Sequence, residues 1–172
     1  MKKNVFLWLC ALVLTMTGLS SCSDDDDTWG SRDQYLPNQG ELCNAWQLIG
    51  YGSEENFHMI AEEYRQKSDT YGYRFYLVFN SDGTFTGRES ANSIFGEYTC
   101  VGSQIKIREL ETTYIYDSKG YEESKAFLSR LMSAKSYGLK GWQQLRIYYS
   151  DNEFLYFESY YSLNHGNWCG TK

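Results

Sequence analysis

The chain has 172 residues, a length typical of one domain, and 17% of them are aromatic while only one is proline. This composition excludes a disordered or collagen-like chain, because enough apolar surface is present to build a core. The net charge at pH 7 is −6, and a phosphate backbone requires clustered Lys and Arg, so we expect no nucleic-acid partner.

Residues 1–21 have the pattern of a signal peptide. Lys2 and Lys3 form a positive start, and the stretch from Val5 to Leu19 is uncharged and mostly apolar. As a helix this stretch would rise about 22 Å, less than the roughly 30 Å of a bilayer's hydrocarbon core. A removable signal therefore explains it better than a permanent membrane span.

The sequence Leu-Ser-Ser-Cys that ends at Cys22 resembles a bacterial lipobox. The resemblance implies that Cys22 begins the mature chain and carries lipid of the palmitate type, which anchors it stably in a membrane. Residues 22–42 are predicted to be a flexible acidic tether, and Asp24–Asp27 resembles a surface-export signal of Bacteroidetes lipoproteins. We expect attachment to the outer membrane with the domain exposed at the cell surface, and a periplasm-facing position is the alternative.

Three cysteines remain for the folded domain, and an odd number allows at most one bridge within the chain. Cys43 precedes the first predicted strand and Cys169 follows the last, and these two places are neighbours in a closed antiparallel sheet. A disulfide between Cys43 and Cys169 is therefore the predicted pairing, and three reduced thiols are the alternative. Cys100 is then expected to be a small buried apolar residue.

The folded domain is expected to begin near Cys43. Ala45 to Tyr51 is the first predicted strand, because it is rich in apolar residues and ends at a Gly-Ser turn. Apolar residues then recur at helical spacing from Phe57 to Tyr64. This spacing predicts an amphipathic helix over Glu54–Lys67, with Ser53 as its N-cap.

Most of the remaining chain alternates with period two between turn residues, which is typical of antiparallel strands. Further strands are predicted over residues 75–79, 84–87, 96–101, 104–108, 112–116, 137–139, 145–149 and 154–158. A second helix is predicted over Tyr121–Ala134, because Phe127, Leu128, Leu131 and Met132 share one face.

The order of these elements resembles the META-domain family, which includes small heat-inducible bacterial envelope lipoproteins. The likeness rests on Trp46-Gln47-Leu48, on the turn at Asn80–Gly83, on the stretch from Asn92 to Tyr98, and on the apolar residues of the second helix and last strands. It implies a mainly β fold over residues 43–172, a lipocalin-like antiparallel β-barrel of about eight strands with one or two accessory helices.

The motif residues of this resemblance have a structural interpretation. Trp46 and Tyr98 are expected to face the core, Asn92 to bond local backbone in a turn, and Gly96 to permit a bend or a close approach. None of these four residues forms a catalytic fingerprint.

Catalytic and metal chemistry find little support in the sequence. Only His58 and His165 are present, and no Ser or Cys is placed beside either by the pattern. Glu89, Glu97, Glu109 and Glu111 are candidates for a paired-carboxylate mechanism, but their surroundings are typical of solvent-facing strand positions. We expect no enzyme activity, no metal and no cofactor.

Tyrosine is the most informative residue, with 16 copies that each combine an apolar ring with a polar tip. Most of these rings are expected to fill or cover the barrel, and Trp142, Tyr148 and Tyr149 are the candidate ligand contacts. We expect a monomeric, non-catalytic envelope lipoprotein that serves binding, interaction or stress tolerance, with a protein, glycan or small-molecule partner. The alternative is a lipocalin-like carrier or sensor of a small amphiphile or glycan.

Overall fold

The computed structural model describes residues 42–66 and 73–159, and it contains nine strands and two helices in those ranges. In chain order they are β1 (Ala45–Gly52), β2 (Phe57–Met59), α1 (Glu62–Arg65), β3 (Tyr76–Phe79), β4 (Thr84–Glu89), β5 (Asn92–Val101), β6 (Gln104–Thr112), α2 (Tyr121–Met132), β7 (Ser136–Lys140), β8 (Gln144–Tyr148) and β9 (Phe154–Ser159). Cys22, His165 and Cys169 lie outside the described residues. None of the helices in this part of the chain is long and apolar enough to cross a membrane.

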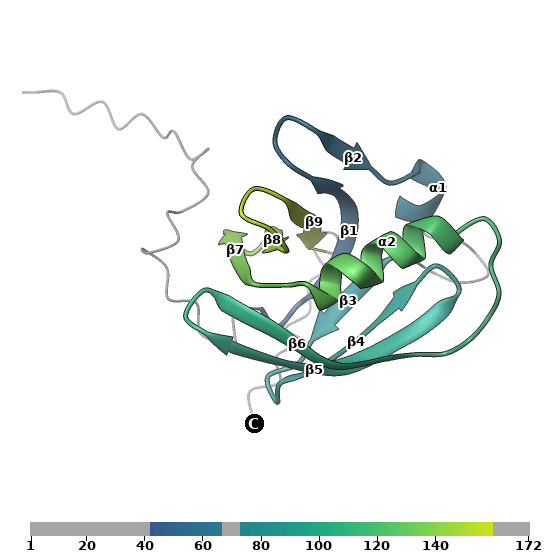
Figure 1. The fold of residues 1–172 in the computed structure, drawn as a ribbon. Helices are drawn as coiled ribbons and strands as arrows, with labels where there is room; N and C mark the ends of the chain where they lie inside the picture. The colour runs from purple at the N-terminus through teal and green to yellow at the C-terminus, as the bar shows by residue number, and fades with distance from the viewer. Residues whose placement is uncertain (1–41, 67–72, 160–172) are drawn as a thin grey trace, which may run out of the picture.

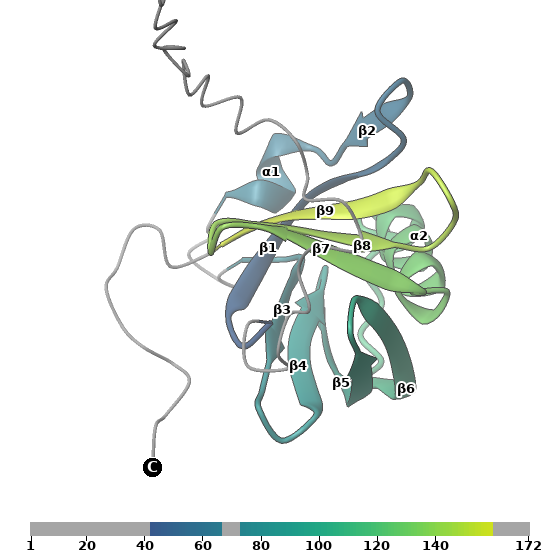
Figure 2. The ribbon, with the colours of Figure 1, turned by 90° about the vertical axis from the view of Figure 1, so that its left-hand side faces the viewer.

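The strands form one antiparallel sheet that closes into a barrel (Figures 1 and 2). Consecutive strands pair from β3 to β9, and β1 joins β3 on one side and β9 on the other, with Trp46 opposite Ser159. The ring therefore has eight strands, and β2 lies outside it, paired with the C-terminal end of β1 at Gly50–Gly52. A mainly β, lipocalin-like barrel of about eight strands with two helices is confirmed.

The pairing of β1 with β9 places the start of the first strand beside the end of the last. Cys43 immediately precedes β1, and its proposed partner Cys169 lies beyond the described residues, so the disulfide stays a prediction. Cys100 on β5 is half-buried against the core. Burial raises the pKa of its thiol to about 11, against a smaller opposing effect of a hydrogen bond with Tyr137.

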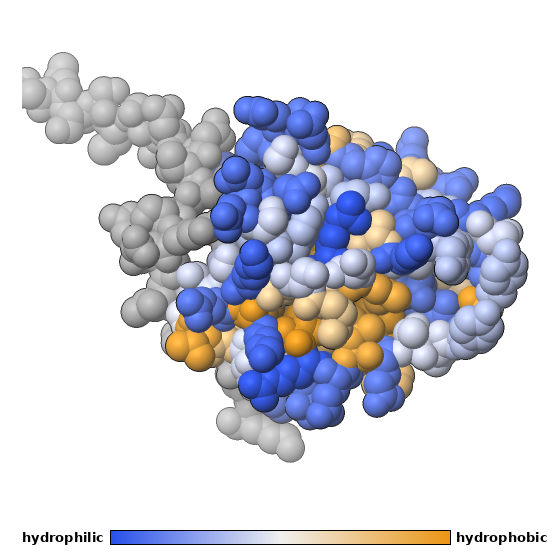
Figure 3. Space-filling view, in the orientation of Figure 1, coloured by the Kyte–Doolittle hydropathy of each residue, from blue (hydrophilic) through white to orange (hydrophobic). Residues whose placement is uncertain are grey.

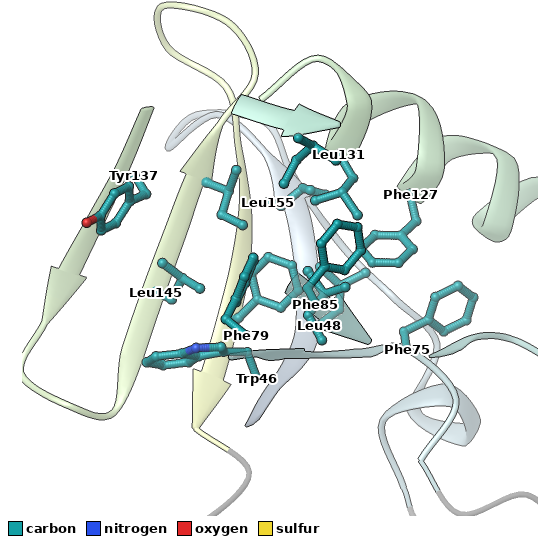
Figure 4. Packing of buried hydrophobic residues seen from close by; sticks show 14 of the residues in the cluster. Trp46, Leu48, Phe75, Phe79, Phe85, Phe127, Leu131, Tyr137, Leu145 and Leu155 are labelled. Atoms are coloured by element: carbon teal, nitrogen blue, oxygen red, sulfur yellow. The ribbon is translucent and has the colours of Figure 1, made fainter. Parts of the chain in front are cut away.

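The barrel has a seam between β6 and β7, where only Gln104 and Ser136 pair. Helix α2 packs along this seam and directs the fully buried Phe127 and Leu131 into the barrel (Figure 4). The Phe127 ring lies 5.9 Å from the ring of Phe75 and 6.4 Å from that of Phe157, in edge-on geometry. Figure 3 shows apolar surface beneath α2 at this seam.

The barrel interior is occupied by its own side chains. Its largest fully buried residues come from five strands, from α2 and from the residue before β3: Trp46, Phe75, Phe79, Phe85, Tyr98, Phe127 and Phe157. The indole Nε1 of Trp46 donates a hydrogen bond to the Leu42 carbonyl at 2.9 Å, so the largest of these side chains has its one polar atom satisfied.

The predicted helix over Glu54–Lys67 is wrong, because this segment forms β2 and the four-residue helix α1. Phe57–Met59 pairs with Gly50–Gly52, and Ser53 accepts a hydrogen bond from the Asn56 backbone N–H in the hairpin turn rather than at a helix N-terminus. A side chain at Gly50 would lie 2.4 Å from the His58 carbonyl, so this glycine is what allows β2 to approach β1.

The predicted strand over 112–116 is also wrong beyond its first residue. Strand β6 ends at Thr112, and residues 113–120 form a loop that leads to α2. The β-branched and aromatic residues that suggested a strand are exposed in this loop, with Tyr114 at 91% and Tyr116 at 73%. The second predicted helix is confirmed as α2, although Met132 at its end is 51% exposed.

Candidate functional site

A pocket of about 710 Å³ lies at one mouth of the barrel. Its walls are the β4–β5 turn, the end of β6, the loop 113–120 and the first turns of α2 (Figure 1). Its lining residues are Glu89, Ser90, Asn92, Thr112, Thr113, Tyr114, Ile115, Tyr116, Asp117, Ser118, Tyr121, Glu122, Ser124, Lys125 and Leu128.

Glu89 is the buried carboxylate of this pocket. It ends β4 on the same face as Phe85 and Gly87, so strand alternation directs it into the barrel mouth. Only 4% of its surface is exposed. Its Oε1 accepts hydrogen bonds from Asn92 Nδ2 at 2.9 Å and from the Thr112 hydroxyl at 3.4 Å, but its buried Oε2 has no partner.

Asn92, the first residue of β5, connects this strand to the loop 113–120. Its Nδ2 also donates to the Ile115 carbonyl at 3.1 Å, and its Oδ1 accepts from the Ile115 backbone N–H. The Ser93 carbonyl accepts from the Thr113 N–H at 3.0 Å, which continues the attachment. These bonds hold the loop over Glu89 and keep the pocket's shape.

The far end of the loop is held by Asp117. The Ser90 hydroxyl donates to Asp117 Oδ2, the Lys119 N–H donates to Oδ1 at 3.1 Å, and Arg74 Nη1 lies 3.8 Å from Oδ2. The Ser90 hydrogen bond is the largest cause that lowers the pKa of Asp117 below its ordinary value. Ser90 itself is 1% exposed and has a φ of 45°, a backbone conformation that residues other than glycine rarely adopt.

We expect Ser90→Ala to lower the free energy of unfolding by about 1–2 kcal/mol at pH 7, because a hydrogen bond to an ionised group is lost. Since the folded-state pKa of Asp117 is depressed, this stabilisation exists above the ordinary carboxyl pKa and is lost as the pH falls through the folded value. Urea unfolding should therefore show a gap between wild type and Ser90→Ala that closes in acid. Ser93→Ala, at an exposed neighbour, is the control.

Three tyrosines and several charges form the outer part of the pocket. Tyr114 and Tyr116 are exposed on the loop, and Tyr121, the first residue of α2, is 54% exposed. Glu122 and Lys125 are exposed on α2 beside them. The lining therefore combines aromatic rings with more carboxylates than cations, a surface suited to ligands that donate hydrogen bonds.

The structure does not bring Trp142, Tyr148 and Tyr149 together. Trp142 is 61% exposed in the β7–β8 turn, whereas Tyr148 and Tyr149 lie at the other end of β8, about 16 Å away at roughly 3.3 Å per residue. Tyr148 lines a smaller hollow of about 350 Å³ with Arg146. Tyr149 is partly buried, and its hydroxyl accepts from Arg130 Nε at 3.2 Å.

The four candidate acids are not gathered at one site. Glu97, Glu109 and Glu111 are exposed, and none of them lines the pocket. The solvent-facing position expected for Glu89 is wrong, because the register of β4 turns it inward. Within residues 42–66 and 73–159, no cluster of His, Cys, Asp and Glu has the arrangement of a metal site.

The remaining motif residues lie at close contacts of the barrel. Tyr98 is 1% exposed, its hydroxyl donates to the Asn80 carbonyl at 2.7 Å, and its ring lies 4.9 Å from that of Phe79. Gly96 sits at a register shift of β5, where a side chain would meet the Phe85 ring at 2.8 Å and the Arg108 carbonyl at 2.9 Å. Their positions are those of packing residues.

His58 lies on β2, outside the pocket. Its Nε2 is 2.9 Å from Glu123 Oε1, and Tyr51 donates to Glu123 Oε2 at 3.1 Å. Burial first, and then the Glu123 charge, raise the pKa of Tyr51 to about 12. The Arg130 guanidinium lies 3.9 Å from the centre of the Tyr51 ring. These contacts fasten the β1–β2 hairpin to α2.

The pattern of the whole domain matches one family model, that of the META domain, over residues 42–160. The chain belongs to the META-domain family. The match covers the complete barrel and α2, so the pocket at the barrel mouth is part of the META domain rather than an appended segment.

Two solved structures are similar to this META domain. An NMR structure of a protein from Burkholderia xenovorans has 16% identity and a TM-score of 0.55, and the match covers 74% of this chain and 90% of that one. A DUF4847 family protein from Bacteroides vulgatus ATCC 8482 has 18% identity and a TM-score of 0.49, with 68% and 92% covered. Comparison with curated proteins finds no match. The Burkholderia likeness supports the fold alone.

Proposed function

We propose that this META domain is the binding part of an envelope lipoprotein, anchored in the outer membrane through Cys22 and exposed at the cell surface. The lipobox-like sequence, the acidic tether and the composition support this placement. The domain acts by binding a small ligand in the pocket at the barrel mouth, and it does so without catalysis. The META family model indicates no enzyme class.

One observation carries the binding proposal: Glu89 Oε2 is buried, has no partner, and belongs to a residue that lines the pocket. Buried polar atoms in native proteins are nearly always hydrogen-bonded, so an orphaned carboxylate oxygen on a residue that lines a pocket indicates a missing donor. A small ligand with hydroxyl or amine donors supplies one.

The aromatic residues around Glu89 favour a glycan over a simple amphiphile. Tyr114, Tyr116 and Tyr121 offer ring faces and hydroxyl groups, whereas the apolar interior that an acyl chain would need is occupied by the core. A sugar ring has an apolar face for the tyrosines and hydroxyl donors for Glu89. We therefore place the ligand among small oligosaccharides.

The proposal is tested by ¹⁹F NMR of the full mature lipoprotein, extracted in detergent and labelled with 3-fluorotyrosine. Tyr→Phe variants assign the signals of Tyr114, Tyr116 and Tyr121, and those of Tyr148 and Tyr149. A titration with β-linked disaccharides should shift the first three signals and leave the other two in place. The detergent-like alkyl glucosides serve as the amphiphile comparison.

Two results would contradict this function. If no disaccharide moves any of the five signals up to about 50 mM, the affinity is weaker than specific binding requires. If only an alkyl chain shifts the pocket tyrosines, the carrier of a small amphiphile is the correct function.

A further inference from the structure

We infer that the ligand group recognised at Glu89 is a protonated amine, so that the pocket selects amino sugars over neutral sugars. This inference rests on the proposed function and specifies its ligand class. The geometry of the carboxylate, the charges of the lining and the aromatic wall each support it.

The Glu89 carboxylate lacks a positive partner. Its Oε1 receives two neutral donors, from Asn92 and Thr112, and it forms no ion pair within the described residues. Burying a carboxylate without a counter-charge is costly, and a hydroxyl group at Oε2 would supply a hydrogen bond but no charge. An ammonium supplies both, because it carries the positive charge and up to three donors.

The other charges of the lining also favour a cationic ligand. Asp117 and Glu122 add two carboxylates, and Lys125 is the one cation among the lining residues, exposed on the outer face of α2. Arg74 lies 3.8 Å from Asp117 and offsets part of its charge, but with Glu89 and Glu122 the pocket still has more carboxylates than cations. The summed field therefore attracts cations and repels phosphates and acidic sugars.

The aromatic wall is compatible with the same ligand. Tyr114, Tyr116 and Tyr121 line the pocket, and the faces of aromatic rings carry partial negative charge that attracts an ammonium. The apolar face of a sugar ring packs against such rings as well. A ring that bears an amine therefore satisfies the carboxylate and the tyrosines in one position.

The test compares three β1,4-linked disaccharides that differ at one position of each ring: cellobiose with hydroxyls, chitosan disaccharide with free amines, and N,N′-diacetylchitobiose with neutral amides. Binding is measured on the full mature lipoprotein in detergent at pH 6, where the amines are protonated, with the ¹⁹F signals of the pocket tyrosines. We expect the amine to bind about 30-fold more tightly than cellobiose, because a charge-assisted pair replaces a neutral hydrogen bond.

Glu89→Gln distinguishes a direct contact between the Glu89 carboxylate and the ligand amine from a general effect of the protein's negative charge. This variant keeps the shape and an acceptor oxygen but removes the charge, so the preference for the amine should fall to about threefold or less. Glu97→Gln removes the same charge from an exposed position outside the pocket and should leave the preference unchanged.

The outcomes are distinguishable. Equal binding of all three disaccharides would overturn the amine inference while leaving the glycan-binding function intact. A preference that Glu97→Gln reduces as much as Glu89→Gln would overturn the direct contact. Failure of all three sugars to bind would remove the proposed function, and the inference with it.

Discussion

Replacing Trp46 by alanine should lower the free energy of unfolding by about 3–5 kcal/mol, the range for truncating a fully buried aromatic side chain. Trp46 is 0% exposed at the start of β1, between the pairings with β3 and β9 that close the barrel. The variant also leaves the Leu42 carbonyl without its indole donor. Single domains are stable by only about 5–15 kcal/mol, so this loss takes a large share of the total.

The measurement is urea unfolding followed by far-ultraviolet circular dichroism. Trp142→Ala is the matched control, because the same side chain is removed from a 61% exposed turn and should change stability by less than about 0.5 kcal/mol. Trp46→Phe should lower the free energy of unfolding by an intermediate amount, and it remains measurable if the alanine variant does not fold. Similar midpoints for Trp46→Ala and Trp142→Ala would contradict the barrel closure described above.

Replacing Phe127 by alanine should cost a comparable amount, about 3–5 kcal/mol. Phe127 anchors α2 at the seam between β6 and β7, where the sheet has a single pair, and its ring contacts Phe75 and Phe157 (Figure 4). Because the seam has few strand hydrogen bonds, the buried face of α2 must supply its stability. Loss of the ring leaves a cavity there that neighbouring strands cannot easily fill.

Met132→Ala is the control on the same helix, since Met132 is 51% exposed and its loss should change stability by about 0.5 kcal/mol or less. Hydrogen exchange should show faster exchange of the α2 amides in Phe127→Ala than in Met132→Ala. Equal exchange in the two variants would mean that α2 is held by the hydrogen bonds of Glu123 with Tyr51 and His58 rather than by the core.

The sequence predicted most of the barrel because its strands have a clear period of two. Phe75, Leu77 and Phe79, like Ile105 and Ile107, alternate in the sequence and face the core in the structure. The helical spacing of apolar residues from Phe57 to Tyr64 predicted a helix that does not form. The spacing fits a helix locally, but the glycines of β1 leave room for a strand to pair there, and local spacing carries no information on that long-range pairing.

The sequence predicts little of the pocket. The sequence pattern places Tyr114 and Tyr116 in a strand, and it offers Trp142, Tyr148 and Tyr149 as ligand contacts instead. A signal for Glu89 was available, because counting by twos from Phe85 turns it inward with the core residues. The loop that covers Glu89 depends on Asn92 reaching Ile115, a contact between distant segments that no local pattern indicates.

A crystal structure of the protein with chitosan disaccharide tests most directly whether Glu89 Oε2 accepts a hydrogen bond from a ligand. We predict an amine nitrogen about 2.7–2.9 Å from Oε2, the range for charge-assisted hydrogen bonds, with a sugar ring against the pocket tyrosines. A structure in which Oε2 accepts a hydrogen bond from the protein's own chain and the sugar is bound elsewhere would contradict the claim.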